Sequence, residues 1–341
     1  MTKVWSEQQV ISIIKSVLQP IMAKGAHDLL DDGASLPPCP KGHTRVVSCD
    51  AFQEGTDFII HELSPLESAG QRAVIQNLSD LSAMGAKPVG FVWSLEVPEM
   101  WLTKNAELIR QFCQGVSKTC LKKKLQFYGG DLSFSQSRFS CTITIFGDVK
   151  GKPLNRRGAK PGDGIYLSRP VGASAAGLKE LLVAVKNPPT PFINGGIKTH
   201  LYPDDEGVIG QALVGLASAC MDISDGLSQD LYKLCQASGV SSVISDLNKA
   251  IDPRIKDLAD AESLTLSSGE EYALLFTIPK ANRKKLQEKL KLRSVIEIGE
   301  IISLRQKKSP QVFLKKNQEL CLLEQSGYDH FSSFSLGQAF L

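Results

Sequence analysis

The sequence predicts a mixed α/β protein, of α/β or α+β type, built from two domains. Three observations support this: a length of 341 residues, strand-like and helix-like patterns that alternate along the chain, and one segment typical of a joint between domains. That segment is Gly151–Gly164, which is rich in glycine, proline and charge, as turns and linkers are. We therefore expect an N-terminal domain over residues 1–150 and a C-terminal α/β domain over residues 151–341.

Apolar periodicity places the elements of the N-terminal half. Strands are expected over 45–48, 89–97 and 139–149, the last with clear alternation at Cys141, Ile143 and Ile145. Helices are expected over 73–84 and 102–121, and Gly85 is expected to stop the first of them.

The same patterns place the elements of the C-terminal half. Strands are expected over 165–168, 240–244, 272–278 and 295–302, and helices over 172–185, 206–219 and 227–236. Segment 186–205 is rich in proline and polar residues, so we interpret it as an excursion on the surface.

Composition excludes several classes of protein. The formal net charge is +3, from 39 basic and 36 acidic residues, so no nucleic acid or anionic membrane partner is expected. No secretory segment is visible, and no apolar stretch approaches the roughly 20 residues of a membrane span. The eight cysteines form no Cys-x-x-Cys pair, which favours reduced thiols in a cytoplasmic protein over a zinc site.

The common nucleotide-binding and hydrolase motifs are missing from the sequence. It contains no Gly-x-x-x-x-Gly-Lys-Ser/Thr loop and no Gly-x-Gly-x-x-Gly after a predicted strand. Gly172–Gly177 misses the Gly-x-Ser-x-Gly elbow by one residue, and is interpreted as a tight helix start. Any nucleotide must therefore be bound in another way.

Acidic residues gather at the expected joints between elements, where ligand groups usually converge. They are Asp31, Asp32, Asp50, Asp80, Asp131, Asp222, Asp225, Glu270 and Glu271. Each alone could be an ordinary helix cap. Asp80 differs, because it lies within a predicted helix beside Leu78 and Leu81, where a buried carboxylate needs a partner.

Several carboxylates together favour a magnesium site that receives a polyphosphate, because Mg²⁺ prefers oxygen ligands and substrate phosphates. Gly129 and Gly130 would expose backbone amides to phosphate oxygens. Arg156 and Arg157 could provide a fork for a phosphate. The pattern indicates chemistry on a metal-bound nucleotide, without naming the second substrate.

A set of short motifs, taken in their order along residues 25–331, resembles the thiamine-monophosphate kinase family. The motifs that carry the resemblance are Asp31–Ala34, Ser48–Asp50, Glu54–Phe58, Asn77–Pro88, Gly129–Asp131, Arg157–Asp163, Met221–Leu227, Ser268–Tyr272, Gly299–Glu300 and Gly327–Phe331. The wider superfamily includes aminoimidazole ribonucleotide synthetase. The resemblance implies that superfamily's two-domain fold, with an N-terminal domain for ATP, metal and dimerisation, and a C-terminal domain that completes the active site. It also implies a homodimer whose N-terminal sheets pair into a barrel.

The resemblance further implies that the γ-phosphate of ATP is transferred to thiamine monophosphate, with several Mg²⁺ ions and no general base. The implied magnesium ligands are Asp32, Ser48, Cys49, Asp50, Asp80, Asp131, Asp222 and Asp225. The implied ATP contacts are Gly130, Asp131, Arg156 and Ser224, and the implied substrate contacts are Asp57, Glu270 and Tyr328.

The sequence departs from the family at two of these positions. Cys49 stands where the family usually has threonine, and Asp57 stands where it usually has histidine. Two alternatives therefore stay open: a sister enzyme of the superfamily that acts on another phosphate or an amide, and a nucleotide-binding relative without catalysis.

Overall fold

The computed structural model describes residues 6–29, 32–60, 63–102, 106–186, 196–290, 295–304 and 309–328. The chain divides into two compact units. The first holds Met1–Leu81 and Lys87–Asp148, and the second holds Ser82–Ala86 and Val149–Leu341. Because Ser82–Ala86 belongs to the second unit, the two units are not separated at a single point of the chain. Within the described residues, no helix has the length and apolar character needed to span a membrane.

The described part of the first unit contains a four-stranded sheet in the order β1-β4-β2-β3. Its strands are β1 (His43–Gln53), β2 (Lys87–Pro98), β3 (Gln126–Ser135) and β4 (Ser140–Lys150). Strand β2 pairs antiparallel with β4 and parallel with β3. Strands β1 and β3 are therefore the two edges of this sheet.

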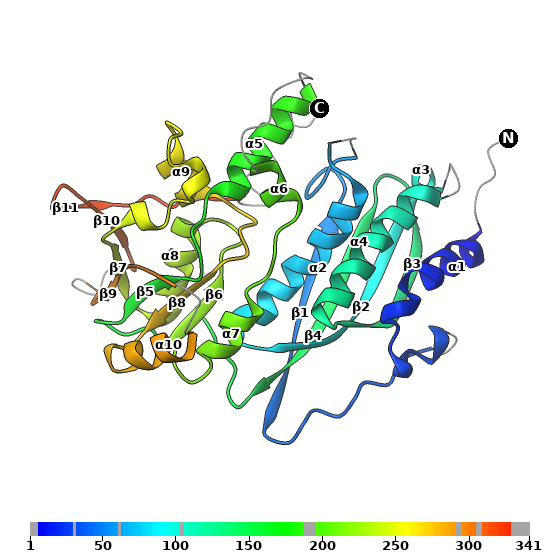
Figure 1. The fold of residues 1–341 in the computed structure, drawn as a ribbon, viewed down its shortest axis with the longest axis horizontal. Coiled ribbons are helices and arrows are strands. Elements are labelled where there is room, and N and C mark those ends of the chain that lie inside the picture. The colour runs from blue at the N-terminus through cyan, green and yellow to red at the C-terminus, as the bar shows by residue number, and fades with distance from the viewer. Residues whose placement is uncertain are drawn as a thin grey trace. The chain divides into compact units, whose positions relative to one another are not determined.

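Helices α2 (Leu66–Ala83) and α4 (Glu107–Lys123) cover one face of this sheet (Figure 1). Their backbones approach closely at two glycines. A Cβ on Gly70 would lie 2.0 Å from the carbonyl oxygen of Phe112, and a Cβ on Gly115 would lie 1.9 Å from that of Glu67. Only glycine allows this approach. Two further helices, α1 (Glu7–Leu18) and the short α3 (Glu99–Leu102), contact α4.

The described part of the second unit contains a seven-stranded sheet in the order β11-β10-β7-β9-β5-β8-β6. The strands are β5 (Gly164–Leu167), β6 (Ala219–Asp222), β7 (Ser241–Ile244), β8 (Leu274–Ile278), β9 (Ile296–Ile302), β10 (Val312–Lys316) and β11 (Glu319–Leu322). All neighbours pair antiparallel except β10 and β7, which are parallel.

The central strands of this sheet are buried between two layers of helices. Leu275 of β8 packs into one core with helix α8 (Leu227–Ser238). Its neighbours Leu274 and Phe276 pack into a second core with α7 (Gly207–Leu213) and α10 (Arg283–Leu290). Alternate residues of a strand point to opposite faces, so a strand with apolar residues throughout is covered on both sides. Three more helices lie in this unit: α5 (Ala173–Lys186), α6 (Gly196–Leu201) and α9 (Ala261–Ser267).

Three of the element predictions are wrong in part. Strand β1 continues through Asp50 to Gln53, so this acid lies within the strand and not at the joint where it was expected. The helix expected over 206–219 ends at Leu213, because the amide of Ser218 pairs with the carbonyl of Thr277 at 2.9 Å and the chain enters β6. Long-range pairing here overrides the local helical pattern.

The third correction concerns segment 186–205. Residues 187–195 lie outside the described part of the chain, but α6 within this segment is not a surface excursion. His200 is 3% exposed and Leu201 is 4% exposed. A Cβ on Gly177 of α5 would lie 2.0 Å from the carbonyl oxygen of Gly196, so the start of α6 packs directly against α5.

Candidate functional site

Strand β1 presents two predicted ligands on one face. Ser48 and Asp50 are two residues apart, so their side chains point to the same side of the strand. The Ser48 hydroxyl donates a hydrogen bond to the carboxylate of Asp80 on α2. Burial, followed by the nearby Asp80, raises the pKa of Asp50 from 3.8 to about 7. These side chains therefore form a group of oxygen atoms with mutual charge repulsion, which a cation would relieve.

Asp57 lies close to the same group. Its carboxylate accepts a hydrogen bond of 2.7 Å from the backbone amide of Gln53 at the end of β1. Its charge also raises the pKa of Asp50, by less than Asp80 does. Asp57, one of the residues expected to contact the substrate, thus lies within electrostatic reach of Asp50, an expected metal ligand.

The side chain of Cys49 points away from this group. Cys49 is exposed, and its sulfur accepts a hydrogen bond of 3.3 Å from Thr144 on β4. It therefore lies on the opposite face of the sheet from Asp50. Only the backbone of Cys49 remains close to the acid pair.

Asp131 shares the face of Cys49 rather than that of Asp50. It pairs with Ser94 of β2, and Ser94 pairs with Thr142, which lies on the Thr144 side of β4. Strands β3 and β1 are opposite edges of the sheet, about three strand spacings or roughly 14 Å apart. The fold of the first unit therefore does not bring Asp131 to Asp50 and Asp80.

The glycines before Asp131 are required by the backbone. Gly129 has φ +118°, and a Cβ on Gly130 would lie 1.9 Å from the carbonyl oxygen of Trp93. The register between β2 and β3 shifts at this point. Asp131 was expected at a joint between elements, but it lies inside β3, beyond this bulge.

Asp32 is exposed, and the two residues before it lie outside the described part of the chain. The preceding segment packs beside β3, where a Cβ on Gly129 would lie 3.4 Å from the side chain of Leu29. Among the residues that the structure describes, no group of three or more His, Cys, Asp or Glu is arranged to hold a metal.

In the second unit, three predicted residues lie between the end of β6 and the start of α8: Asp222 is the last residue of β6, and Ser224 and Asp225 lie in the loop that follows. A buried carboxylate that the sequence reasoning missed, Asp230 of α8, shapes this loop. It accepts hydrogen bonds from the backbone amides of Ser224 (3.1 Å), Asp225 (3.0 Å) and Gly226 (3.2 Å). Its other oxygen lies 2.9 Å from Lys233 Nζ. Lys233 also pairs with Asp225, so one lysine bridges the loop and the helix.

Two more predicted residues lie beside this loop. The amide of Glu270 donates to the carbonyl of Ser224 at 2.8 Å, and the amide of Tyr328 donates to that of Asp225 at 2.9 Å. Five predicted site residues from three distant motifs therefore meet at one end of α8.

Comparisons with known proteins agree with the motif set. The model of the family described as AIR synthase related protein, N-terminal domain, matches residues 30–149. The thiamine-monophosphate kinase of Buchnera aphidicola subsp. Schizaphis graminum is 34% identical over 312 residues, covering 89% of this chain and 92% of the relative. The chain belongs to the thiamine-monophosphate kinase family. By this membership it is a kinase.

Solved structures of the family share the fold. The thiamine-monophosphate kinase of Stenotrophomonas maltophilia K279a matches with a TM-score of 0.74 at 25% identity, over 92% of this chain and 98% of that one. AaThiL, described as complexed with AMPPCP and TMP, matches with a TM-score of 0.73 at 27% identity, over 95% and 97%. The expected mixed α/β fold of this superfamily is thereby confirmed.

One residue expected at the ATP site of this family member lies apart from the loop that holds Ser224. The carbonyl of Arg156 accepts a hydrogen bond of 3.0 Å from Ser238, at the last turn of α8. Ser224 precedes the first turn of this twelve-residue helix, which is about 18 Å long. The backbones of Arg156 and Ser224 are therefore separated by about the length of α8.

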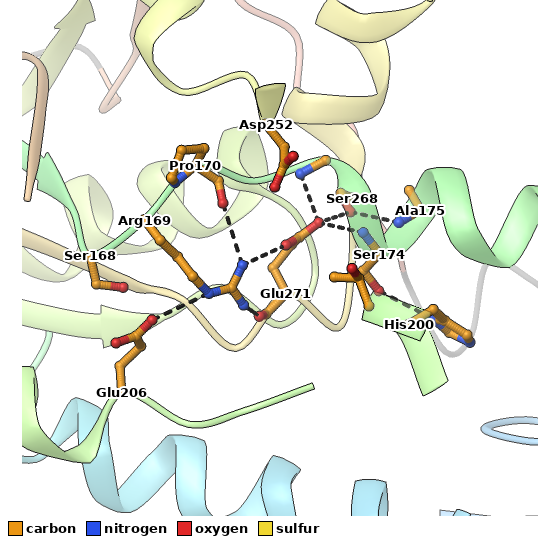
Figure 2. Close-up of polar contacts among 12 residues, drawn as sticks. Ser168, Arg169, Pro170, Ser174, Ala175, His200, Glu206, Asp252, Ser268 and Glu271 are labelled. Carbon is orange, nitrogen blue, oxygen red and sulfur yellow. Dashed lines mark hydrogen bonds and ion pairs between the residues drawn. The ribbon is translucent and has the colours of Figure 1, made fainter. Parts of the chain in front are cut away.

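A buried ion pair lies beside Glu270 and was not identified from the sequence (Figure 2). The Glu271 side chain is fully buried, and one of its oxygens lies 3.2 Å from Arg169 Nη1. Arg169 Nε also lies 3.3 Å from Glu206. The sequence shows only that Glu271 is adjacent to Glu270, which does not indicate which of the two is buried.

Proposed function

We propose that this protein transfers the γ-phosphate of ATP to the phosphate of thiamine monophosphate, giving thiamine diphosphate and ADP. The observation that carries the proposal is the 34% identity with a thiamine-monophosphate kinase over 89% of the chain. The structural similarity to AaThiL, which is described with AMPPCP and TMP, supports the same pair of substrates.

The side chains at the predicted ligand positions suit Mg²⁺. Ser48, Asp50 and Asp80 provide oxygen ligands in the first unit. Burial, followed by the nearby Asp80, raises the pKa of Asp50 to about 7, and a bound cation would offset the charge repulsion between the two acids. Asp222 and Asp225 offer carboxylates in the second unit, and we also propose Asp32 and Asp131 as ligands. Bound magnesium would reduce the repulsion between the two phosphates.

The transfer needs no base from the protein. The second pKa of a phosphate monoester is near 6, so the acceptor oxygen is already ionised at neutral pH. The protein must instead bring the two phosphates into line and hold them there. This requirement agrees with a motif set that is rich in carboxylates and holds no proposed histidine base.

We assign the remaining residues according to their chemistry. The thiazolium ring of thiamine is a permanent cation, so the carboxylates of Asp57 and Glu270 suit it electrostatically. Tyr328 offers an aromatic face to the same cation. Gly130, Asp131, Arg156 and Ser224 are proposed as ATP contacts. The N-terminal domain would then bind ATP and metal, and the C-terminal domain would complete the site.

We further propose that the protein is a homodimer whose N-terminal sheets pair into a barrel, through the face opposite α2 and α4. This face carries Val47, which is 63% exposed. Pairing would also satisfy the edge strands, which otherwise promote aggregation. We place the protein in the cytoplasm, since all eight cysteines are free thiols.

The test is an assay of the purified protein with ATP, Mg²⁺ and thiamine monophosphate, analysed for thiamine diphosphate by chromatography. Parallel reactions should contain thiamine, other phosphate monoesters, or EDTA in place of magnesium. We expect diphosphate only with thiamine monophosphate and magnesium. Turnover of another acceptor would favour the sister-enzyme alternative. ATP binding without turnover of any acceptor would favour the inactive relative.

A further inference from the structure

The loop Ser268–Tyr272 has an unusual backbone. Glu270 has φ +52° and Tyr272 has φ +54°, so two residues with bulky side chains occupy the left-handed region. Such a conformation persists only where the surroundings enforce it, and it is common at functional sites. Glu270 is one of the residues proposed to contact the substrate, so the contacts that enforce this loop bear on substrate binding.

Glu271, which lies between these two residues, anchors the loop through its side chain. Glu271 Oε1 accepts hydrogen bonds from the amides of Gly172 at 2.7 Å and Ser174 at 3.0 Å, and from the hydroxyl of Ser268 at 2.6 Å. The two amides lie at the start of α5, where a helix favours a negative charge. The Glu271 side chain is 0% exposed.

Arg169 completes the anchor from the opposite side (Figure 2). Its guanidinium lies 3.2 Å from Glu271 Oε2 and also donates to the Glu271 backbone carbonyl. Arg169 thus binds both the carboxylate and the backbone carbonyl of Glu271, the residue between the two left-handed positions. Glu206 lies 3.3 Å from Arg169 Nε, which fixes the arginine from a third direction.

The neighbouring Glu270 faces a different environment. Its side chain is 29% exposed, and its carboxylate lies 3.7 Å from Nδ1 of the buried His200 and 3.3 Å from the hydroxyl of Tyr272. The backbone amide of Glu270 is held by Ser224, in the loop that carries Asp225. The two consecutive glutamates therefore differ in role. Glu271 is buried and anchors the loop, whereas the side chain of Glu270 is partly exposed.

We propose that Glu271, held by Arg169, is a positioning residue that fixes Glu270 in the geometry that binds the cationic acceptor. This inference rests on the proposed function, and concerns the acceptor rather than ATP. Glu271 itself has no contact with either substrate in this assignment. It acts through the backbone of the loop.

The experiment measures two dissociation constants by calorimetry, for thiamine monophosphate and for a non-hydrolysable ATP analogue, each with Mg²⁺. Glu271→Gln keeps the side-chain shape but loses the ion pair, and Arg169→Lys loses the two-sided grip of the guanidinium. We expect each change to weaken thiamine monophosphate binding about tenfold or more, and to leave binding of the ATP analogue within about twofold. Asp260→Asn is the matched control, because it removes an exposed ion pair to Lys179 of α5, the helix whose start holds Glu271.

A double-mutant cycle with Glu270→Gln separates positioning from a general loss of stability. If Glu271 acts through Glu270, the double variant binds thiamine monophosphate no more weakly than Glu270→Gln alone. If Glu271→Gln does not fold, Ser268→Ala takes its place in the cycle. It removes one hydrogen bond to Glu271 and one from the amide of Ala175, and leaves the ion pair with Arg169 in place.

Equal weakening of both ligands, or additive losses in the cycle, would overturn the inference while leaving the proposed function intact. A wild-type protein that neither binds nor phosphorylates thiamine monophosphate would overturn both. Turnover in the wild type together with a non-additive, acceptor-specific loss in the variants supports both.

Discussion

At the scale of single residues, the candidate site is defined by the direction in which each side chain points. Ser48 and Asp50 face Asp80, whereas Cys49 between them faces Thr144 on the other side of the sheet. The alternation of a strand produces this difference within three consecutive residues. A thiol is an unusual magnesium ligand, and this alternation directs the Cys49 side chain away from the acids.

Asp80→Asn tests whether these acids form a metal site. Removing one of two neighbouring charges should leave the ligand-free protein as stable as the wild type or more stable. Saturating Mg-ATP should stabilise the wild type by roughly 2.7 kcal/mol at 100 times the dissociation constant, and most of this gain should be lost in the variant. Thermal melts with and without Mg-ATP measure both quantities. A destabilised variant with an undiminished ligand effect would remove Asp80 from the metal site.

The same acid pair predicts a pH dependence of the metal-free protein. The pKa of Asp50 is about 7 in the fold and near 3.8 when unfolded, so between these values the folded state holds the extra proton. Stability from this group is therefore lost as the pH rises from about 4 to 7. Asp80→Asn should flatten this dependence, measured by urea unfolding in EDTA. An unchanged slope would show that Asp80 does not contribute to the raised pKa of Asp50.

Cys49→Thr should retain the fold and the kinase activity. The Cys49 side chain is exposed and contacts Thr144, away from Asp50, and a threonine hydroxyl can accept the same hydrogen bond. Cys49→Val serves as the control that removes the polar atom but keeps a similar volume. A large loss of activity in both variants, with normal thermal melts, would show that the sulfur itself is needed.

At the scale of elements, a side chain of helix α8 holds the loop that precedes the helix. Asp230, in the first turn of α8, accepts hydrogen bonds from three successive loop amides and pairs with Lys233. Burial raises the pKa of Asp230, and Lys233 opposes this effect. The carboxylate of an α8 side chain thus reaches back to the amides ahead of the helix, as the acidic residue of a capping box does for the N-cap amide.

Asp230→Ala should cost about 3 kcal/mol of unfolding free energy, because it removes hydrogen bonds to a buried charge and leaves three amides without an acceptor. Amide hydrogen exchange at Ser224, Asp225 and Gly226 should accelerate at the same time. Asp246→Ala is the matched control, since Asp246 pairs with Lys249 at the same spacing but on the surface. Its expected cost is below about 1 kcal/mol. Equal losses in the two variants would contradict the capping role.

At the scale of the whole molecule, the two faces of the first sheet differ. One face is covered by α2 and α4, whereas on the other face Val47 is 63% exposed. Exposed apolar residues on a sheet face are a hazard that association removes. This asymmetry supports the homodimer proposed above.

Val47→Glu should therefore shift the protein from dimer to monomer, because it would place two buried charges across the shared face. Light scattering after size-exclusion chromatography at micromolar concentration measures the change. Val208→Glu is the control, as Val208 is 60% exposed but lies on α7 of the second unit. A wild type that is monomeric, or a Val47 variant that stays dimeric, would contradict the proposed interface.

The sequence by itself determined the family, the mixed α/β class, and the strands and helices with strong periodicity, such as β2 and α8. It also singled out Asp222, Ser224, Asp225, Glu270 and Tyr328, which the structure brings together. These features depend on local patterns and on motifs that keep their order along the chain.

Only the tertiary structure decided which acids lie together and which are buried. It separates Asp131 from Asp50 by faces and strands, gives Asp230 its loop amides, and buries Glu271 rather than Glu270. It also ends a helix at Leu213, so that Ala219 can pair with Thr277. In each case the deciding partner is a strand, helix or backbone amide that the local pattern does not specify, and the cost of burying an unpaired charge or amide selects the arrangement.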